Sequence, residues 1–246
     1  MGRHEPERFP SPAALARAVA ERWLSILASS SSANAPFTVA LSGGRIARDL
    51  FSHAASAAKQ RGLTLANVDF FWGDERCVPP DDAESNFRAA NELLLAPLAI
   101  PLARIHRVRG EADPDTAAQE AAVELLRVAP MDNAGQPVLD LVFLGMGEDG
   151  HVASLFPGES DEVMNSVAVY RAVTASKPPP RRITLGYATL AAAREVWVLA
   201  SGAGKAEALR ESLRPDGCTP LARLLRMRER TTIFTDITAA SSAGKG

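Results

Sequence analysis

The chain has 246 residues, of which 46% are apolar and 23% charged, and its formal net charge is −2 at pH 7. This composition is typical of a globular protein with a core, and it excludes the basic excess expected of a nucleic-acid-binding surface. The two cysteines have no spacing typical of a metal site or disulfide framework. No apolar run reaches the roughly 20 residues of a membrane span, and no charged-then-apolar leader opens the chain. We therefore expect a soluble, cytoplasmic protein with no nucleic-acid or membrane partner.

Strands and helices are predicted to alternate along the chain. A hydroxyl cap and a proline at residues 11–12 predict the start of a first helix, which places Leu15, Val19, Trp23 and Ile26 on one face. Residues 29–36 predict a surface loop. Strands are predicted at 37–41, 68–72, 138–144, 167–173 and 195–200, with weaker ones near 105–108, 182–185 and 231–235. Further helices are predicted at 46–61, 85–96, 114–128, 203–213 and 219–227.

The predicted strands are continuous apolar runs, which are typical of a parallel sheet that helices cover on both faces. Together with the strand–helix alternation, they predict an α/β fold with a doubly wound, mostly parallel sheet. We expect a single domain over 1–246 with a flexible tail from about residue 239. The sequence leaves the oligomeric state open, and a monomer is compatible with it.

Four loops at the expected carboxyl ends of strands combine glycine with charged or hydroxyl side chains. They are SGGR at 42–45, GDERC at 73–77, GMGEDGH at 145–151 and SGAGK at 201–205. Ligands of open α/β sheets bind beyond these strand ends. The four loops therefore predict one shared pocket.

Two of these loops are candidates for binding an anion. In SGGR, backbone N–H groups at a helix start favour an anion and Arg45 adds charge, although a simple tight turn fits equally well. SGAGK does not match a nucleotide-binding P-loop. The motif requires a glycine where this chain has Leu199, and a serine or threonine where it has Ala206. Lys205 still suits a single phosphate, with a solvated surface lysine as the alternative. The charges of GDER fit a salt-bridged hinge or a substrate site equally.

Glycines 145, 147 and 150 spell G-x-G-x-x-G, which is typical of a dinucleotide-binding turn. Pro157 and Gly158 end any helix that begins at 151, and no acidic residue closes the next strand, so this interpretation is weak. The glycines fit a tight, exposed turn with His151 at its edge better than a dinucleotide-binding turn. Imidazole can act as a base at neutral pH. We favour catalysis by His151 over a packing role. Ser154 belongs to no G-x-S-x-G elbow.

Three blocks of the sequence resemble the 6-phosphogluconolactonase family. They are GMGEDGHVASLFPG, GDERCVPPDDAESNFRAA and KPPPRRITLGYATLAAAREVWVLASGAGKAEAL. The resemblance implies hydrolysis of 6-phospho-D-glucono-1,5-lactone to 6-phosphogluconate, in the pentose phosphate pathway. It also implies the fold of glucosamine-6-phosphate deaminases and ribose-5-phosphate isomerases, a sugar-phosphate lactone as the small-molecule partner, and no metal or organic cofactor.

With this resemblance, the residues suggest roles in lactone hydrolysis. His151 is the candidate general base, Asp74 could orient a sugar hydroxyl or His151, and Arg76 completes the candidate catalytic set. The candidates for binding the substrate or its phosphate are Ser42, Gly43, Gly44, Arg45, Lys205, Arg182, Gly147, Asp149 and Gly150. The sequence does not decide which cation meets the phosphate.

The chain departs from the family at two places. Arg45, Ile46 and Ala47 replace small hydroxyl residues and a proline, and Ala191 replaces a frequent asparagine. An amino-sugar-phosphate deaminase is a weaker alternative, because Leu155 and Phe156 replace the Asn-Glu pair of that family. A non-catalytic sugar-phosphate sensor and a nicotinamide oxidoreductase are also weaker, since no DNA-binding segment precedes residue 37 and the dinucleotide motif fails.

Overall fold

The computed structural model describes residues 4, 6–30 and 35–238, and a six-stranded parallel sheet forms its centre. All neighbouring strands of this sheet run parallel. Their order is β1 (Glu7–Arg8), β9 (Thr232–Thr235), β8 (Glu195–Ala200), β5 (Leu141–Gly145), β2 (Phe37–Leu41) and β3 (Val68–Trp72). The prediction of a mostly parallel α/β sheet is confirmed.

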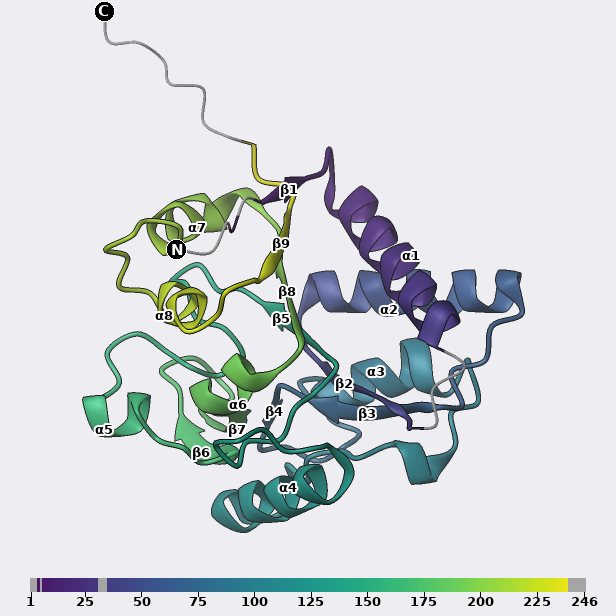
Figure 1. Cartoon of the computed structure of the whole chain (residues 1–246), viewed down its shortest axis with the longest axis horizontal. Coiled ribbons are helices and arrows are strands. Elements are labelled where there is room, and N and C mark those ends of the chain that lie inside the picture. The colour runs from purple at the N-terminus through teal and green to yellow at the C-terminus, as the bar shows by residue number, and fades with distance from the viewer. Residues whose placement is uncertain (1–3, 5, 31–34, 239–246) are drawn as a thin grey trace, which may run out of the picture.

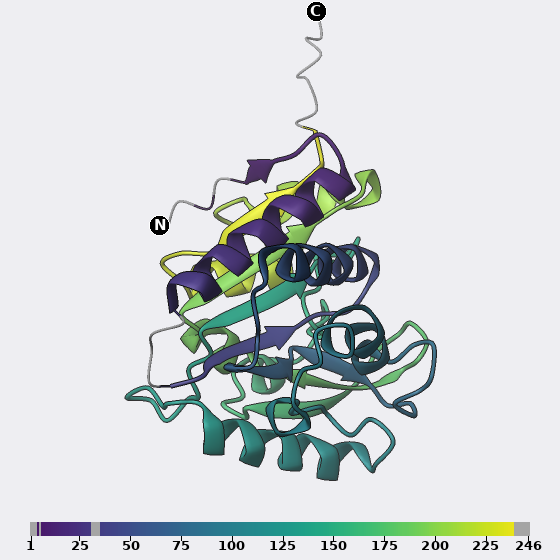
Figure 2. The ribbon, with the colours of Figure 1, turned by 90° about the vertical axis from the view of Figure 1, so that its right-hand side faces the viewer.

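Helices cover both faces of the sheet. The α-helices are α1 (Pro12–Ser30), α2 (Arg45–Arg61), α3 (Asn86–Ala90), α4 (Pro114–Val128), α5 (Asp161–Met164), α6 (Tyr187–Ala192), α7 (Ala206–Ser212) and α8 (Pro220–Arg226). Figure 1 shows α1 and α2 on one face of the sheet and α6, α7 and α8 on the other. The view in Figure 2 shows α1 in front of the sheet, running along the strands behind it.

A second, antiparallel sheet of three strands was not foreseen. It has the order β4 (Asp74–Arg76), β7 (Arg181–Leu185) and β6 (Tyr170–Thr174), and α4 packs against β6 and β7. Only Gly73 separates β3 from β4, so the chain passes directly from the large sheet into the small one. The charged run after VDFFW is therefore a strand rather than a loop.

Several predicted boundaries were wrong. The strand expected at 138–144 begins at Leu141, because a backbone hydrogen bond from Val138 to Pro130 closes a turn before it. The strand expected near 105–108 is a single bridge between Ile105 and Phe70. The helix expected at 85–96 becomes π-helical over Asn91–Leu95, and the one expected at 203–213 opens with the 3₁₀ turn Ala203–Lys205. A further 3₁₀ turn spans Leu102–Arg104.

Aromatic side chains fill the core between α1 and the large sheet. Trp23 contacts Phe143 edge-on, with ring centroids 5.3 Å apart, and Trp197 stands 5.8 Å from Phe143. Within the predicted face of α1, Leu15, Val19 and Trp23 are fully buried, whereas Ile26 is half-buried. This packing fixes α1 and the strand ends that carry the loops.

The loop expected at 29–36 and the tail expected from 239 fall largely outside the described residues. Helix α1 extends to Ser30, and β2 begins at Phe37. Among the described residues, we find no helix with the length and apolar character needed to cross a membrane.

Candidate active site

A cavity of about 500 Å³ opens at the carboxyl ends of β2, β5 and β8, beside β4. The register of β5 with β8 pairs Gly145 with Leu199, so the loops that follow these strands start at the same level. All four segments contribute to its wall, three of them as loops and the fourth as β4, and the prediction that they share one pocket is confirmed. Its lining residues are Pro12, Ser42, Gly43, Gly44, Arg45, Ile46, Asp49, Asp74, Arg76, Asn86, Gly145, Met146, Glu148, His151, Ala153, Arg182, Ser201, Gly202, Ala203, Gly204 and Lys205.

One end of the cavity, the α2 pole, consists of the turn Ser42–Gly44 with Arg45 and Lys205. Gly44 has φ 88°, a left-handed conformation that favours glycine. No side chain of the described residues caps α2, so N–H groups of its first turn can bind an anion. Burial lowers the pKa of the Lys205 ammonium, nearby Glu148 raises it, and Arg45 lowers it again. Two cations therefore lie close together at a helix N-terminus.

Neither cation of the α2 pole has an ionic partner in the described part of the chain. Among the described residues, neither Arg45 nor Lys205 forms an ion pair or a side-chain hydrogen bond. Glu148 lies beside this loop, since a Cβ on Gly204 would stand 2.8 Å from its Oε1. An anion bound at the α2 pole would thus meet two cations that no carboxylate of the described residues contacts directly.

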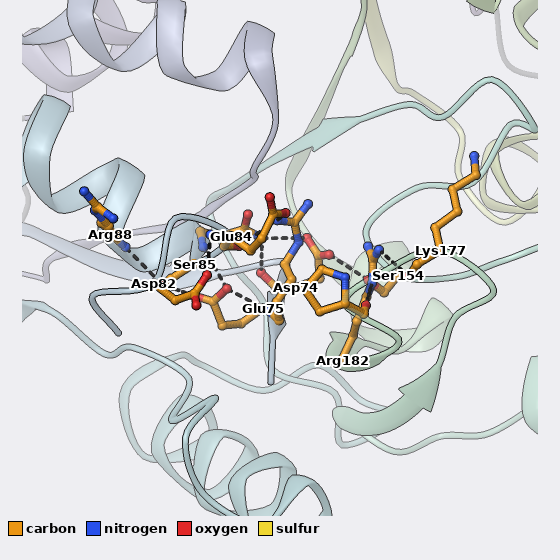
Figure 3. Close-up of polar contacts among 12 residues, drawn as sticks. Asp74, Glu75, Asp82, Glu84, Ser85, Arg88, Ser154, Lys177 and Arg182 are labelled. Atoms are coloured by element: carbon orange, nitrogen blue, oxygen red, sulfur yellow. Dashed lines mark hydrogen bonds and ion pairs between the residues drawn. The ribbon is translucent and has the colours of Figure 1, made fainter. Parts of the chain in front are cut away.

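The other end, the β4 pole, consists of Asp74, Arg76 and Arg182. Oδ2 of Asp74 accepts a hydrogen bond from Oγ of Ser154 at 2.7 Å (Figure 3). Nη1 of Arg76 donates to the carbonyl of Glu84 at 2.6 Å and forms an ion pair with its carboxylate at 3.3 Å, while the buried Nε has no partner among the described residues. The contacts with Ser154 and Glu84 hold the two side chains at the cavity wall.

Arg182 is almost fully buried at this pole, with 6% of its surface exposed. Its Nε donates to the carbonyl of Pro179 and its Nη2 to that of Lys177, and the guanidinium lies 5.5 Å from the centre of the Phe156 ring. Burial lowers the pKa of Arg182, and the neighbouring charge of Arg76 lowers it further. The burial of this guanidinium is costly, and it places a second cation beside Arg76 in the cavity wall, near the carboxylates of Asp74 and Glu84.

His151 lies in the cavity wall and is oriented by Asp149. Oδ1 of Asp149 lies 2.5 Å from Nδ1 of the ring and accepts from the backbone N–H of His151 at 3.2 Å. Burial raises the pKa of Asp149, but its hydrogen bonds to His151 outweigh this and lower it. Gly147 permits the arrangement, because a Cβ there would stand 2.0 Å from Nδ1. Nε2 forms no hydrogen bond within the described chain, so it is free to act on a ligand.

The contacts of Asp74 bear on the two roles considered for it, the orientation of a sugar hydroxyl or of His151. In the structure Asp149 contacts the His151 ring, while Asp74 contacts Ser154 and Asn86. Gly147, Asp149 and Gly150 are absent from the cavity lining; they form the turn that supports His151. The remaining predicted residues all line the cavity.

Sequence reasoning missed Asn86 and Glu148 as cavity residues. The Ser-Asn pair at 85–86 is typical of a helix cap, and the side chain of Ser85 does accept a hydrogen bond from the N–H of Arg88. The family resemblance of the GDER block includes this pair, and that resemblance was the signal that could have identified Asn86 as a cavity residue. In the described part of the chain, no group of three or more His, Cys, Asp or Glu side chains has an arrangement suited to a metal ion.

Comparison with known proteins identifies the family. A family described as glucosamine-6-phosphate isomerases/6-phosphogluconolactonase matches residues 10–234. A 6-phosphogluconolactonase of Mycobacterium tuberculosis is 38% identical over 210 residues, covering 82% of this chain and 83% of the relative. One from Streptomyces coelicolor is 33% identical, covering 92% and 90%.

A solved structure supports the same relationship. The solved structure of a 6-phosphogluconolactonase from Trypanosoma brucei superimposes with a TM-score of 0.81 at 29% identity, and the match covers 96% of this chain and 97% of that one. The likeness therefore extends over nearly the whole of both chains. The chain belongs to the glucosamine-6-phosphate isomerase/6-phosphogluconolactonase family.

Proposed function

We propose that this protein is a 6-phosphogluconolactonase, which hydrolyses 6-phospho-D-glucono-1,5-lactone to 6-phosphogluconate in the pentose phosphate pathway. The observation that carries the proposal is His151, held by Asp149, in the wall of a cavity that Arg45 and Lys205 line at one place and Arg76 and Arg182 at another. The pair offers a base for water, and the two poles offer separate sites for the phosphate and for the reacting carbonyl. The reaction needs no cofactor, and we place it in the cytoplasm.

His151 would act as the general base. With Nδ1–H donating to Asp149, Nε2 is free to take a proton from water, whose oxygen then forms a bond to the lactone carbonyl carbon. Such a base contributes about 10²–10⁴ in rate. The tetrahedral intermediate collapses by breaking the bond to the ring oxygen, which receives the proton from the imidazolium. Asp149 stabilises that imidazolium through its negative charge.

The two poles would bind different parts of the substrate. The α2 pole would bind the phosphate, because Arg45, Lys205 and the free N–H groups of α2 gather positive charge there. The β4 pole would stabilise the oxyanion through Arg76 or Arg182, and one such donor is typically worth about 10²–10³ in rate. Asp74 would then accept a hydrogen bond from a sugar hydroxyl.

Hydrolysis fits the site better than the deamination of an amino sugar phosphate. Leu155 is fully buried and Phe156 packs against the His151 ring, with centroids 4.8 Å apart. These apolar side chains stand where a deaminase would need its additional carboxylate. Water attack on an activated ester requires only the base and the oxyanion donors.

The experiment is proton release in weakly buffered solution with freshly generated lactone, after subtraction of spontaneous ring opening. We expect acceleration by the wild-type protein and its loss in a folded His151→Ala variant. Acceleration that survives in the variant would assign the base elsewhere. A folded wild-type protein that gives no acceleration would refute the lactonase proposal, and ammonia release from glucosamine-6-phosphate would then test the deaminase alternative.

A further inference from the structure

Asn86 touches both poles of the cavity. It is the first residue of α3, is 3% exposed and lies in the cavity wall. Its Nδ2 donates to the carbonyl of Asp74 at 2.9 Å, in the β4 pole. Its carboxamide also packs on Gly43 of the α2 pole so closely that a Cβ there would stand 1.9 Å from Oδ1. One side chain thus bridges the two ends of the site.

The backbone of Asn86 is fixed independently of its side chain. The buried carboxylate of Glu75 accepts from the N–H groups of Asn86 at 2.8 Å and Phe87 at 2.7 Å, and from the hydroxyl of Ser85 at 3.2 Å. Figure 3 shows Glu75 directed toward Ser85, while Asp74 on the same strand is directed toward Ser154. The start of α3 is therefore attached to β4, and the Asn86 carboxamide extends from this anchor to Gly43.

The bridge matters because the poles belong to different sheets. Gly43 follows β2 of the parallel sheet, whereas Asp74 and Arg76 form β4 of the antiparallel sheet. A ligand with an anionic group at each end must match the separation of the poles, and a misplacement of about 1 Å can cost on the order of 10²-fold in rate. The contact of Asn86 with Gly43 limits how closely the two poles can approach.

We propose that Asn86 is a positioning residue that sets the distance between the α2 pole and the β4 pole, and thereby selects ligands with a phosphate at one end and an oxyanion or carboxylate at the other. This inference rests on the proposed function for the identity of the ligand. It assigns to Asn86 no contact with reacting atoms. Its effect is expected only for ligands that span both poles.

Binding can test this without catalysis. We would measure, by calorimetry, the affinity of 6-phosphogluconate, which carries a phosphate and a carboxylate, and of inorganic phosphate, which occupies one pole. In Asn86→Ala we expect the affinity for 6-phosphogluconate to fall about tenfold or more, with that for inorganic phosphate changed less than about twofold. Gln136→Ala is the matched control, since Gln136 is a buried carboxamide outside the cavity lining whose Nε2 donates to the carbonyl of Val167.

The proposal is overturned if both affinities fall together, if neither changes, or if wild type binds 6-phosphogluconate no more tightly than inorganic phosphate. Gly43→Ala is the second variant, for use also if Asn86→Ala does not fold. The methyl group added at residue 43 would press on the Asn86 carboxamide and should weaken 6-phosphogluconate binding. When Asn86 is already alanine, the same methyl group should weaken this binding much less. Additive effects of the two changes would also refute the bridge.

Kinetics separate this proposal from the proposed function. If wild type hydrolyses the phosphorylated lactone, Asn86→Ala should reduce kcat/KM for it far more than for unphosphorylated glucono-1,5-lactone, whereas a general loss of structure would reduce both alike. If wild type hydrolyses neither, the lactonase proposal fails, and the binding measurements alone decide the role of Asn86.

Discussion

Replacing Asp149 with asparagine should remove most of the catalysis that His151 provides. The carboxylate lies 2.5 Å from Nδ1 and also accepts from the His151 backbone N–H. An asparagine oxygen can still accept from Nδ1–H, but it lacks the charge that stabilises the imidazolium, and its NH₂ group in that place would favour the wrong tautomer. The general base is worth about 10²–10⁴ in rate, so we expect kcat to fall by about this factor, or about 3–5 kcal/mol.

The assay is the initial rate of proton release at saturating lactone, with KM measured alongside. KM should change little, because Asp149 is absent from the cavity lining. Asp216→Asn is the control, since this carboxylate is paired with Arg214 on the surface. The double variant with His151→Ala should be no slower than His151→Ala alone. Full kcat in Asp149→Asn, or a further multiplicative loss in the double variant, would contradict the reasoning.

Two further predictions concern charge. Lys205→Met should raise KM for the phosphorylated lactone about 10- to 100-fold, because a hydrogen bond to a charged group is worth about 1.5–3 kcal/mol; an equal effect on glucono-1,5-lactone would place the phosphate elsewhere. Burial raises the pKa of Glu75 from 4.5 to about 7, against the lowering effect of its backbone hydrogen bonds. Folding therefore takes up a proton between these values, and the free energy of unfolding should fall as the pH rises from 4.5 to 7, by at most about 3 kcal/mol. Urea unfolding should show a flatter pH dependence in Glu75→Gln, and an unchanged slope would mean that Glu75 is ionised throughout.

The sequence predicted most of the large sheet, because its central strands are apolar on both faces. Runs such as FTVAL and EVWVLA have no polar face that could be left in water, and the helices between them keep one apolar side. The same logic located the cavity, since loops that follow parallel strands meet at one edge of the sheet. His151 could be singled out because it follows such a strand within a glycine turn.

The antiparallel sheet could not be predicted in the same way. Asp74–Arg76 contains three charged residues, a composition that disfavours a strand, and β4 forms because Glu75 finds buried donors at the start of α3. Those donors lie about ten residues further along the chain and become available only after folding. The polarity of a residue indicates whether it needs a buried or a polar environment. It does not indicate which distant group provides the hydrogen bonds.

The sequence by itself therefore determined the fold class, the four segments that line the cavity and the histidine beside them. Only the tertiary structure decided that Asp149 rather than Asp74 holds His151, that the cations separate into two poles, and that Asn86 bridges them. The physical reason is that hydrophobic periodicity is local along the chain, whereas hydrogen bonds and ion pairs depend on distances of about 3 Å between atoms of separate elements. Such distances exist only once both sheets have packed.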